Sequence, residues 1–168
     1  MRTLYLLRHA KSSWDDPSLA DHDRPLAPRG KRDSKRMAYE VRRLDPAPEL
    51  VLCSSSARTT ETLKRLGDAV GSAEVRVEHR IYAASAGELL ARLHRVADEV
   101  GSVMVIAHNP GLQDLALLLA ARGEEPDRLR AKYPTAALAS LAIARASWST
   151  LKPGDAELVA YVVPRDLG

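Results

Sequence analysis

Val103-Met104-Val105-Ile106-Ala107-His108-Asn109-Pro110-Gly111 is the clearest indication of how this chain folds. The five leading apolar residues predict a strand that is covered on both faces, as in parallel sheets. After the Pro-Gly turn, Leu112, Leu115, Ala116 and Leu119 share one face at helical spacing. A buried strand followed by a helix is the repeating unit of α/β folds, so the same unit is expected elsewhere in the chain.

The same strand–helix pattern recurs upstream of this stretch. Strands are expected at 3–8, 50–53 and 75–77, and helices at 29–44, between Ser54-Ser55-Ser56 and Gly71, and at 86–100. Residues 122–135 are polar and are expected to form loop or irregular helix, and the runs 137–144 and 156–163 look like an antiparallel pair. The pattern predicts a three-layer α/β/α sandwich with a mainly parallel central sheet and an antiparallel edge.

Composition places the chain among globular proteins. Its 168 residues are 45% hydrophobic and 28% charged, which suits one domain with a sizeable core. The single cysteine, Cys53, excludes an internal disulfide and fits a reducing compartment. The apolar run before Arg8 is too short for a signal peptide, and no stretch is apolar for long enough to span a membrane. We therefore expect a cytoplasmic protein that has no membrane partner.

Basic residues are concentrated in the expected first helix. The net charge is +3, and seven cations crowd one segment: Arg29, Lys31, Arg32, Lys35, Arg36, Arg42 and Arg43. This run can be a solvated helix face, or it can attract an anionic substrate such as an acidic protein surface. Nucleic acid is not expected as a partner, because acidic residues interrupt the run.

Arginine and histidine recur where the predicted strands end. Arg8-His9 ends the first strand, Arg58 follows the second, and His108 ends the strand at 103–107. The carboxyl ends of parallel strands form the ligand-binding edge of such a sheet, so these four side chains are expected to converge. Charged groups of one sign repel each other, and a phosphate would relieve that repulsion because the arginine fork matches its oxygens. The strand ends therefore predict a phosphate site.

Four local motifs add a family resemblance. Leu6-Leu7-Arg8-His9-Ala10 resembles the strand-terminal Arg-His-Gly signature of the histidine phosphatase superfamily, whose fold is phosphoglycerate mutase-like. The segment 54–62 resembles its Ser-x-x-x-Arg-x-x-x-Thr motif, 105–111 resembles the segment with its second essential histidine, and 24–30 resembles its Arg-Pro-Leu-Thr-x-x-Gly stretch. The short SixA-type phosphohistidine phosphatases have these motifs in this order, and the resemblance covers about residues 2–120.

The resemblance implies a catalytic mechanism. His9 would attack phosphorus and become phosphorylated, and water would then release phosphate. Arg8, Arg58 and His108 would hold the equatorial oxygens of the phosphoryl group. The chain would then be a single histidine phosphatase domain over residues 1–168. It would hydrolyse phosphohistidine or phosphoric monoesters without a metal or other cofactor.

Three further residues near the nucleophile are expected to contact the substrate. Ser12 could donate a hydrogen bond to phosphate, Lys11 could meet an acidic substrate, and Asn109 directly follows the second histidine. Their assignment as substrate-binding residues rests on their position in the motifs.

The chain departs from the wider family at two places. Ala10 replaces the usual glycine, as in other SixA-type members with an Arg-His-Ala signature. The glutamate that serves as general acid in mutase-like members has no good match, since Glu78 and His79 fit its surroundings poorly. SixA-type proteins resemble this chain in lacking that acid, which suits a labile P–N bond. His22 and His94 are expected to be exposed and to have no part in the site.

Other functions remain open at this point. The substrate could be a small phosphate ester instead of a phosphorylated protein, and the chain could bind phosphate without catalysis. A recognition module would not require a nucleophile, which favours an enzyme. A metal hydrolase is disfavoured because no His-x-x-x-His pair is present and arginines would repel a cation.

Overall fold

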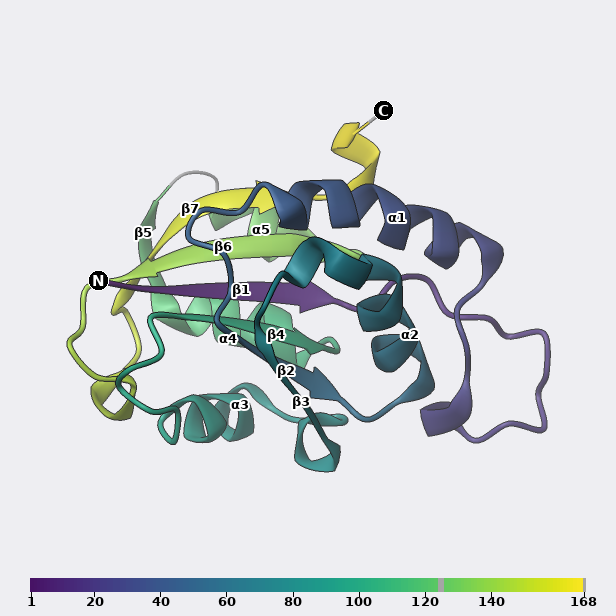
Figure 1. The fold of residues 1–168 in the computed structure, drawn as a ribbon, viewed down its shortest axis with the longest axis horizontal. Helices are drawn as coiled ribbons and strands as arrows, with labels where there is room; N and C mark the ends of the chain where they lie inside the picture. The colour runs from purple at the N-terminus through teal and green to yellow at the C-terminus, as the bar shows by residue number, and fades with distance from the viewer. Residues whose placement is uncertain (124–125, 168) are drawn as a thin grey trace.

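A computed structural model describes residues 1–123 and 126–167. It forms one seven-stranded sheet in the order β3-β2-β4-β1-β6-β7-β5, with helices on both faces (Figure 1). The strands are β1 (Arg2–Arg8), β2 (Leu50–Ser54), β3 (Glu74–Glu78), β4 (Ser102–Ala107), β5 (Ala120–Gly123), β6 (Leu138–Ile143) and β7 (Ala156–Val162). The α-helices are α1 (Pro28–Arg42), α2 (Ala57–Leu66), α3 (Ala86–Leu93), α4 (Gly111–Leu119) and α5 (Pro126–Ala131). The short 3-10 helices are η1 (Asp21–Asp23), η2 (Gly67–Val70), η3 (His79–Ile81), η4 (Trp148–Thr150) and η5 (Pro164–Leu167).

The direction of the strands confirms the predicted fold class. β1 pairs with β4, β2 with β4 and with β3, and β5 with β7, all in parallel. β6 runs antiparallel to both β1 and β7, which places the expected antiparallel pair on one side of the sheet. The register aligns Arg8 with Ala107 and Cys53 with Ile106, so β1, β2 and β4 end at the same edge.

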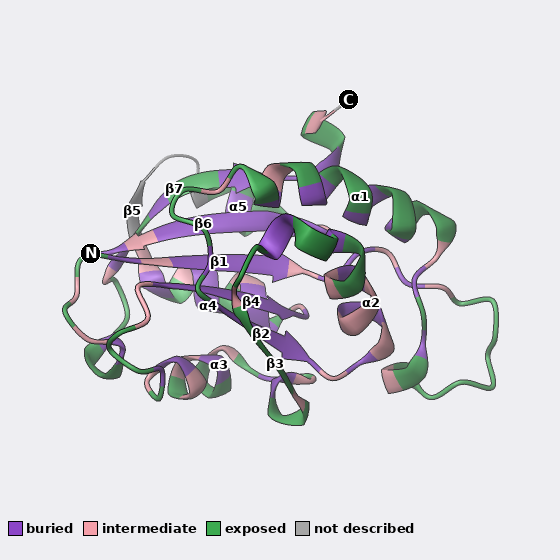
Figure 2. Ribbon diagram, viewed as in Figure 1, coloured by how far each residue is buried: buried purple, intermediate pink, exposed green. Residues whose placement is uncertain are grey.

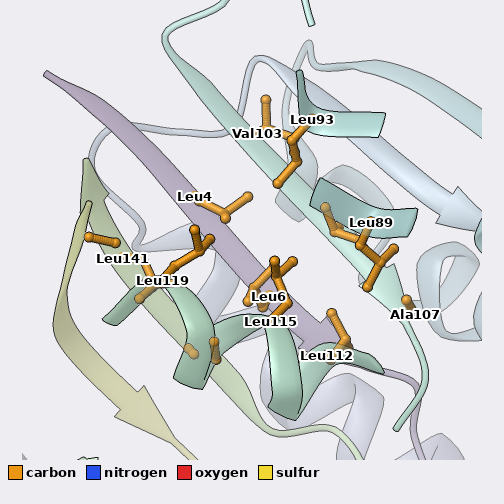
Figure 3. Close-up of a cluster of buried hydrophobic side chains, with 14 of the residues drawn as sticks. Leu4, Leu6, Leu89, Leu93, Val103, Ala107, Leu112, Leu115, Leu119 and Leu141 are labelled. Atoms are coloured by element: carbon orange, nitrogen blue, oxygen red, sulfur yellow. The ribbon is translucent and has the colours of Figure 1, made fainter. Parts of the chain in front are cut away.

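Two apolar layers enclose the sheet, and β1 contributes to both. Leu4 and Leu6 face the layer covered by α3, α4 and α5, where leucines from α3 and α4 close over the sheet (Figure 3). Tyr5 and Leu7 face the layer covered by α1 and α2. This alternation along a strand buried on both faces explains why its sequence is almost continuously apolar, and Figure 2 shows the central strands buried.

The helices are short. The longest described helix, α1, has 15 residues, and none of the described helices combines the length and apolar character needed to cross a membrane.

The helix expected at 86–100 ends at Leu93 instead. The residues between Leu93 and β4 are held by contacts with distant parts of the chain. The Arg2 guanidinium donates to the carbonyls of Asp98 and Val100, each at 2.8 Å, and the Trp148 indole also donates to Val100 O at 2.7 Å. These contacts come from distant parts of the chain, which a local periodicity does not register.

The polar segment 122–135 contains the expected irregular helix, α5, but also the end of a strand that was not predicted. β5 pairs in parallel with β7 and shifts register at Ala120/Arg122. No apolar run marks this segment, because its pairing depends on backbone bonds to the free edge of β7. Residues 124 and 125 lie outside the described residues.

Candidate active site

Two histidine rings meet at the carboxyl ends of adjacent strands. His9 follows β1, His108 follows β4, and their ring centroids are 5.2 Å apart. The backbone N–H of His9 donates to Ala107 O at 3.1 Å, which continues the ladder between the two strands beyond their ends. Both histidines are 6% exposed, so the site lies in a largely dry setting where electrostatic interactions are strong.

The tautomer of His9 is set by the backbone carbonyl group of the next residue, Ala10. Nδ1 lies 2.7 Å from Ala10 O, and because a carbonyl oxygen only accepts hydrogen bonds, Nδ1 must carry the proton. Nε2 then holds the lone pair. Burial lowers the pKa of His9 to about 3. The hydrogen bond to Ala10 O acts to raise this pKa, whereas the nearby His108, Arg8 and Arg58 lower it further. His9 is therefore neutral near pH 7.

His108 is hydrogen-bonded to the last residue of β2, Ser54. Its Nε2 lies 2.7 Å from Ser54 Oγ, and its Nδ1 is buried without a hydrogen-bond partner among the described residues. Burial lowers the pKa of His108 to about 4, and the positive charge of Arg58 is the second-largest cause of this lowering. If Ser54 donates to Nε2, the ring proton lies on Nδ1, where it is available to an anion.

The two arginines are fixed by backbone carbonyl groups and by one carboxylate. Arg58 lies in the first turn of α2, which Ser56 caps by accepting from Thr59 N. Its Nη1 donates to Asp21 O at 2.7 Å and its Nη2 to Asp21 Oδ2 at 2.9 Å. Arg8 Nη1 donates to Tyr133 O at 2.9 Å, while its buried Nε lacks a partner among the described residues. Burial lowers the pKa of Arg8, and the nearby Arg58 lowers it further.

Asp21 is a site residue that the sequence did not single out. Besides Arg58, it accepts from the Tyr82 hydroxyl at 2.6 Å and from Arg24 Nη1 at 3.1 Å. The hydrogen bond from Tyr82 holds the pKa of Asp21 well below its usual range, and the bonds from Arg58 and Arg24 lower it further. The signal that could have identified it is its place three residues before Arg24, which begins the Arg-Pro-Leu motif.

The loop after His9 is pinned by α2 and α1. Ala10 N donates to Thr62 Oγ1 at 3.0 Å, and Thr62 donates to Arg58 O at 2.7 Å, which links the loop after His9 to α2. On the other side, a Cβ on Gly30 would lie 2.1 Å from Lys11 O. Only a glycine permits this approach of α1 to the loop.

Two of the predicted substrate-binding residues, Lys11 and Ser12, lie in this loop, and the third, Asn109, lies between β4 and α4. Ser12 is buried, and its Oγ accepts from Arg24 Nη2. Lys11 is half-buried. The Asn109 amide is committed to the protein, because Nδ2 donates to Tyr133 O at 3.0 Å and Oδ1 accepts from Gln113 N at 3.2 Å. Its contacts are those of a residue that fixes the start of α4.

Glu78 at the end of β3 is paired with Arg92 on α3. Arg92 donates to it twice, at 2.7 and 3.0 Å, and these bonds lower the pKa of Glu78. An ionised, paired carboxylate is a poor proton donor.

His22 and His94 are half-buried, and the expectation that both are exposed was wrong. His94 Nε2 bonds Leu151 O at 2.6 Å. His22 packs edge-on against Tyr82 at 4.7 Å, so it belongs to the rim of the site. Its Nε2 lies 2.8 Å from Ser55 Oγ, which in turn lies 3.2 Å from His79 Nδ1. These contacts join three loops, and no local pattern predicts them.

The site as a whole can bind an anion and supply a neutral nucleophile. Arg8, Arg58 and two largely buried imidazoles converge at one sheet edge, as their mutual effects on pKa show. Within residues 1–123 and 126–167, no group of three or more His, Cys, Asp or Glu side chains is placed to hold a metal ion.

Residues 4–102 match the family described as the Histidine phosphatase superfamily (branch 1). The chain therefore belongs to this family, and the expected resemblance is confirmed. Family membership supports phosphatase activity on phosphorylated substrates. An uncharacterized protein of Mycobacterium tuberculosis H37Rv, Rv1276c, is 39% identical over 163 residues, which cover 95% of this chain and 100% of that protein.

Solved structures point to the SixA-type branch. A structure from Nakamurella multipartitia, assigned as a phosphohistidine phosphatase SixA, is 32% identical with a TM-score of 0.83 and covers 97% of this chain and 96% of that one. The protein histidine phosphatase SixA complexed with tungstate has 26% identity and a TM-score of 0.77, with 99% of each chain covered.

Proposed function

We propose that this chain is a phosphohistidine phosphatase that forms a covalent intermediate on His9. The observation that carries the proposal is the hydrogen bond of 2.7 Å from His9 Nδ1 to Ala10 O. It leaves a lone pair on Nε2 of a ring that is neutral near pH 7. This ring lies beside a second histidine and two arginines.

In the first step, Nε2 of His9 attacks phosphorus while the bond to the leaving group breaks. The lone pair forms the new N–P bond, and the electrons of the breaking bond go to the leaving nitrogen or oxygen. Arg8, Arg58 and the Nδ1 proton of His108 would bind the three equatorial oxygens, where charge is spread in the transition state. The hydrogen bond from His9 Nδ1–H to Ala10 O would stabilise the positive charge that develops on the imidazole ring.

In the second step, water attacks the phosphorylated His9. The water oxygen forms the new O–P bond, the N–P bond breaks, and its electrons return to Nε2. Orthophosphate leaves with the water oxygen, and the two protons of the water stay on the phosphate or pass to solvent. Asp21 would keep Arg58 oriented through both steps, because it accepts from Nη2 at 2.9 Å.

The state of the carboxylates favours phosphohistidine over an alkyl phosphate as substrate. Glu78 is paired with Arg92, and the pKa of Asp21 is strongly lowered, so neither is suited to protonate a poor leaving group. The imidazole of a phosphohistidine can leave after it takes a proton from solvent. A phosphohistidine borne on a protein is therefore the substrate class we propose, and we propose that hydrolysis requires no metal.

The test compares release of phosphate from a phosphohistidine-bearing protein and from an aryl phosphate, with chelator present, by wild type, His9→Ala and His94→Gln. His94→Gln is the matched control, because His94 bonds Leu151 O, outside the site. We expect hydrolysis by wild type and by the control, none by His9→Ala, and the higher kcat/KM on the phosphoprotein. Full activity of a folded His9→Ala protein would contradict the proposal, and a preference for the aryl ester would contradict the substrate class.

The covalent step has its own readout. Brief incubation with a ³²P-labelled substrate, followed by denaturation in alkali, should leave label on the wild-type chain, because phosphohistidine survives alkali and is lost in acid. The label should be absent from His9→Ala. Label that persists in the variant would place the nucleophile elsewhere.

A further inference from the structure

A second concentration of charge lies beyond the carboxyl end of β7. An open cavity of about 630 Å³ is lined by α1, by α5 with the chain that follows it, and by the segment 161–165. In Figure 1, this is where α1 and the yellow C-terminal segment meet. β7 runs antiparallel to β6, as β1 does, so the cavity opens at the same sheet edge as the histidine site. Ligands of α/β proteins bind at this edge.

Six cationic side chains line this basic cavity, and they come from three separate parts of the chain: Arg29, Arg32, Arg36, Arg128, Lys132 and Arg165. The three from α1 are spaced i, i+3 and i+7, which puts them on one helix face. Asp33 is the lone carboxylate among the described lining residues.

The positive charge in the basic cavity is only partly compensated. Asp33 lies 3.6 Å from Arg29 and 3.8 Å from Arg36, at the long end of ion-pair distances, and Arg128 pairs with Asp166 at 2.8 Å. The other three cations, Arg32, Lys132 and Arg165, make no ion pair with any described residue. Crowding like charges has a cost that a bound anion removes.

The shape and the side chains indicate the kind of anion. A hollow of this volume is within the usual range for small-molecule sites, whereas a protein partner is met by a broad, flatter surface. Arginine presents a planar fork that matches phosphate oxygens, and arginines on three sides suit several phosphate groups in one ligand. We propose that the basic cavity binds a small anion that carries several phosphate groups, such as inorganic tripolyphosphate or a nucleoside polyphosphate.

This cavity is separate from the proposed phosphatase site but shares a wall with it. Pro134 and Thr135 line the cavity. The adjoining Tyr133 O accepts from Arg8 Nη1 at 2.9 Å, and Ala136 N donates to His9 O at 3.0 Å. The ligand would thus bind behind the segment that fixes the arginine and the nucleophile, and its binding does not depend on any catalytic step.

The experiment is titration of the full chain with inorganic tripolyphosphate by calorimetry at low ionic strength, where exposed charges are least screened. The cavity variant is Arg32→Ala/Lys132→Ala/Arg165→Ala. The charge-matched control is Lys35→Ala/Lys64→Ala/Lys152→Ala, which removes three exposed lysines outside the cavity. Arg58→Ala reports on binding at the histidine site.

We expect the cavity variant to weaken tripolyphosphate binding by about 10-fold or more, while the control and Arg58→Ala stay within about 3-fold of wild type. A far-ultraviolet circular dichroism spectrum and a Tm like those of wild type would show that the cavity variant is folded. Equal losses in the cavity variant and the lysine control would overturn the proposal, as would a loss confined to Arg58→Ala. Binding of polyglutamate without binding of tripolyphosphate would overturn it in favour of an acidic protein partner.

Discussion

At the scale of single residues, the site works through the protonation of two rings. His9 Nδ1 is occupied by Ala10 O, so the neighbouring carbonyl group selects the tautomer that leaves Nε2 free. Burial keeps both His9 and His108 neutral near pH 7, and the two arginines discourage their protonation further. The positive potential that disfavours protonation of the two rings also favours binding of an anionic phosphoryl group.

Substitution of Arg58 measures how much this arginine contributes to turnover. Arg58→Ala removes two donors that Asp21 holds in a fixed orientation, and we expect turnover to fall by about 100-fold or more. Arg58→Lys should restore little, because an ammonium cannot reproduce the planar fork. Steady-state rates on a phosphohistidine-bearing protein give the measurement. Turnover near the wild-type value in Arg58→Ala would remove this residue from the site.

The two histidines also define a pH window for stability. Their pKa values of about 3 and about 4 in the folded chain lie below the usual histidine value of about 6.5. The unfolded chain therefore binds more protons in this range. Stability contributed by the neutral rings is fully present above about pH 6.5 and is lost as the pH falls toward their folded pKa values.

Thermal unfolding between about pH 7 and pH 5 should show this loss as a falling Tm. The fall should be smaller in His9→Gln, whose side chain does not titrate. The quantity compared is the change in Tm with pH, so a variant that has a lower Tm at pH 7 can still be compared with wild type. Equal slopes in the two proteins would mean that His9 is not buried in its neutral form.

At the scale of elements, helix N-termini bring the site together. α2 carries Arg58 in its first turn, α4 starts three residues after His108, and α1 presses against the loop that follows His9. These contacts hold the loop after His9 from two sides, through Thr62 on α2 and Gly30 on α1.

Gly30→Ala should reveal how tightly α1 and the loop fit. Its Cβ would meet Lys11 O at 2.1 Å, so we expect a loss of about 1–3 kcal/mol in the free energy of unfolding and a lower turnover. Gly87→Ala on α3 is the control, because its Cβ has nothing nearer than Ser85 Oγ at 3.9 Å. Urea unfolding measures both variants. A Gly30→Ala protein as stable as Gly87→Ala would contradict the close contact.

At the scale of the whole molecule, the central strand joins two apolar layers. Leu6 and Leu7 are neighbours in β1, yet they face opposite layers, and both are fully buried. Each layer therefore loses its packing surface when β1 leaves the sheet. This arrangement is what we expect of one cooperative folding unit over residues 1–168.

Leu6→Ala and Leu7→Ala should each lower the free energy of unfolding by about 2–5 kcal/mol. Unfolding should remain a single transition, with near- and far-ultraviolet circular dichroism giving the same midpoint. The control is Leu118→Ala, whose side chain is 38% exposed and which should change stability by about 0.5 kcal/mol or less. Two separate transitions in either core variant would indicate that the layers unfold independently.

The fold class and four site residues could be predicted because local signals carry them. Continuous apolar runs identify β1, β2 and β4, since strands buried on both faces must be apolar throughout. Arg8, His9, Arg58 and His108 follow from their places at the strand ends and from the motifs around them. The end of α3 and the strand β5 were missed, because their pairing partners are distant in the chain.

The phosphatase class could be inferred from sequence, because the candidate site residues sit in short contiguous motifs at predictable strand ends. Tertiary structure alone decided which groups surround them. Asp21 and Tyr82 meet across 61 residues, and cations of the basic cavity come from three separate segments. Charges and hydrogen bonds act through space and fall off with distance, so these partners are known only once the chain has folded.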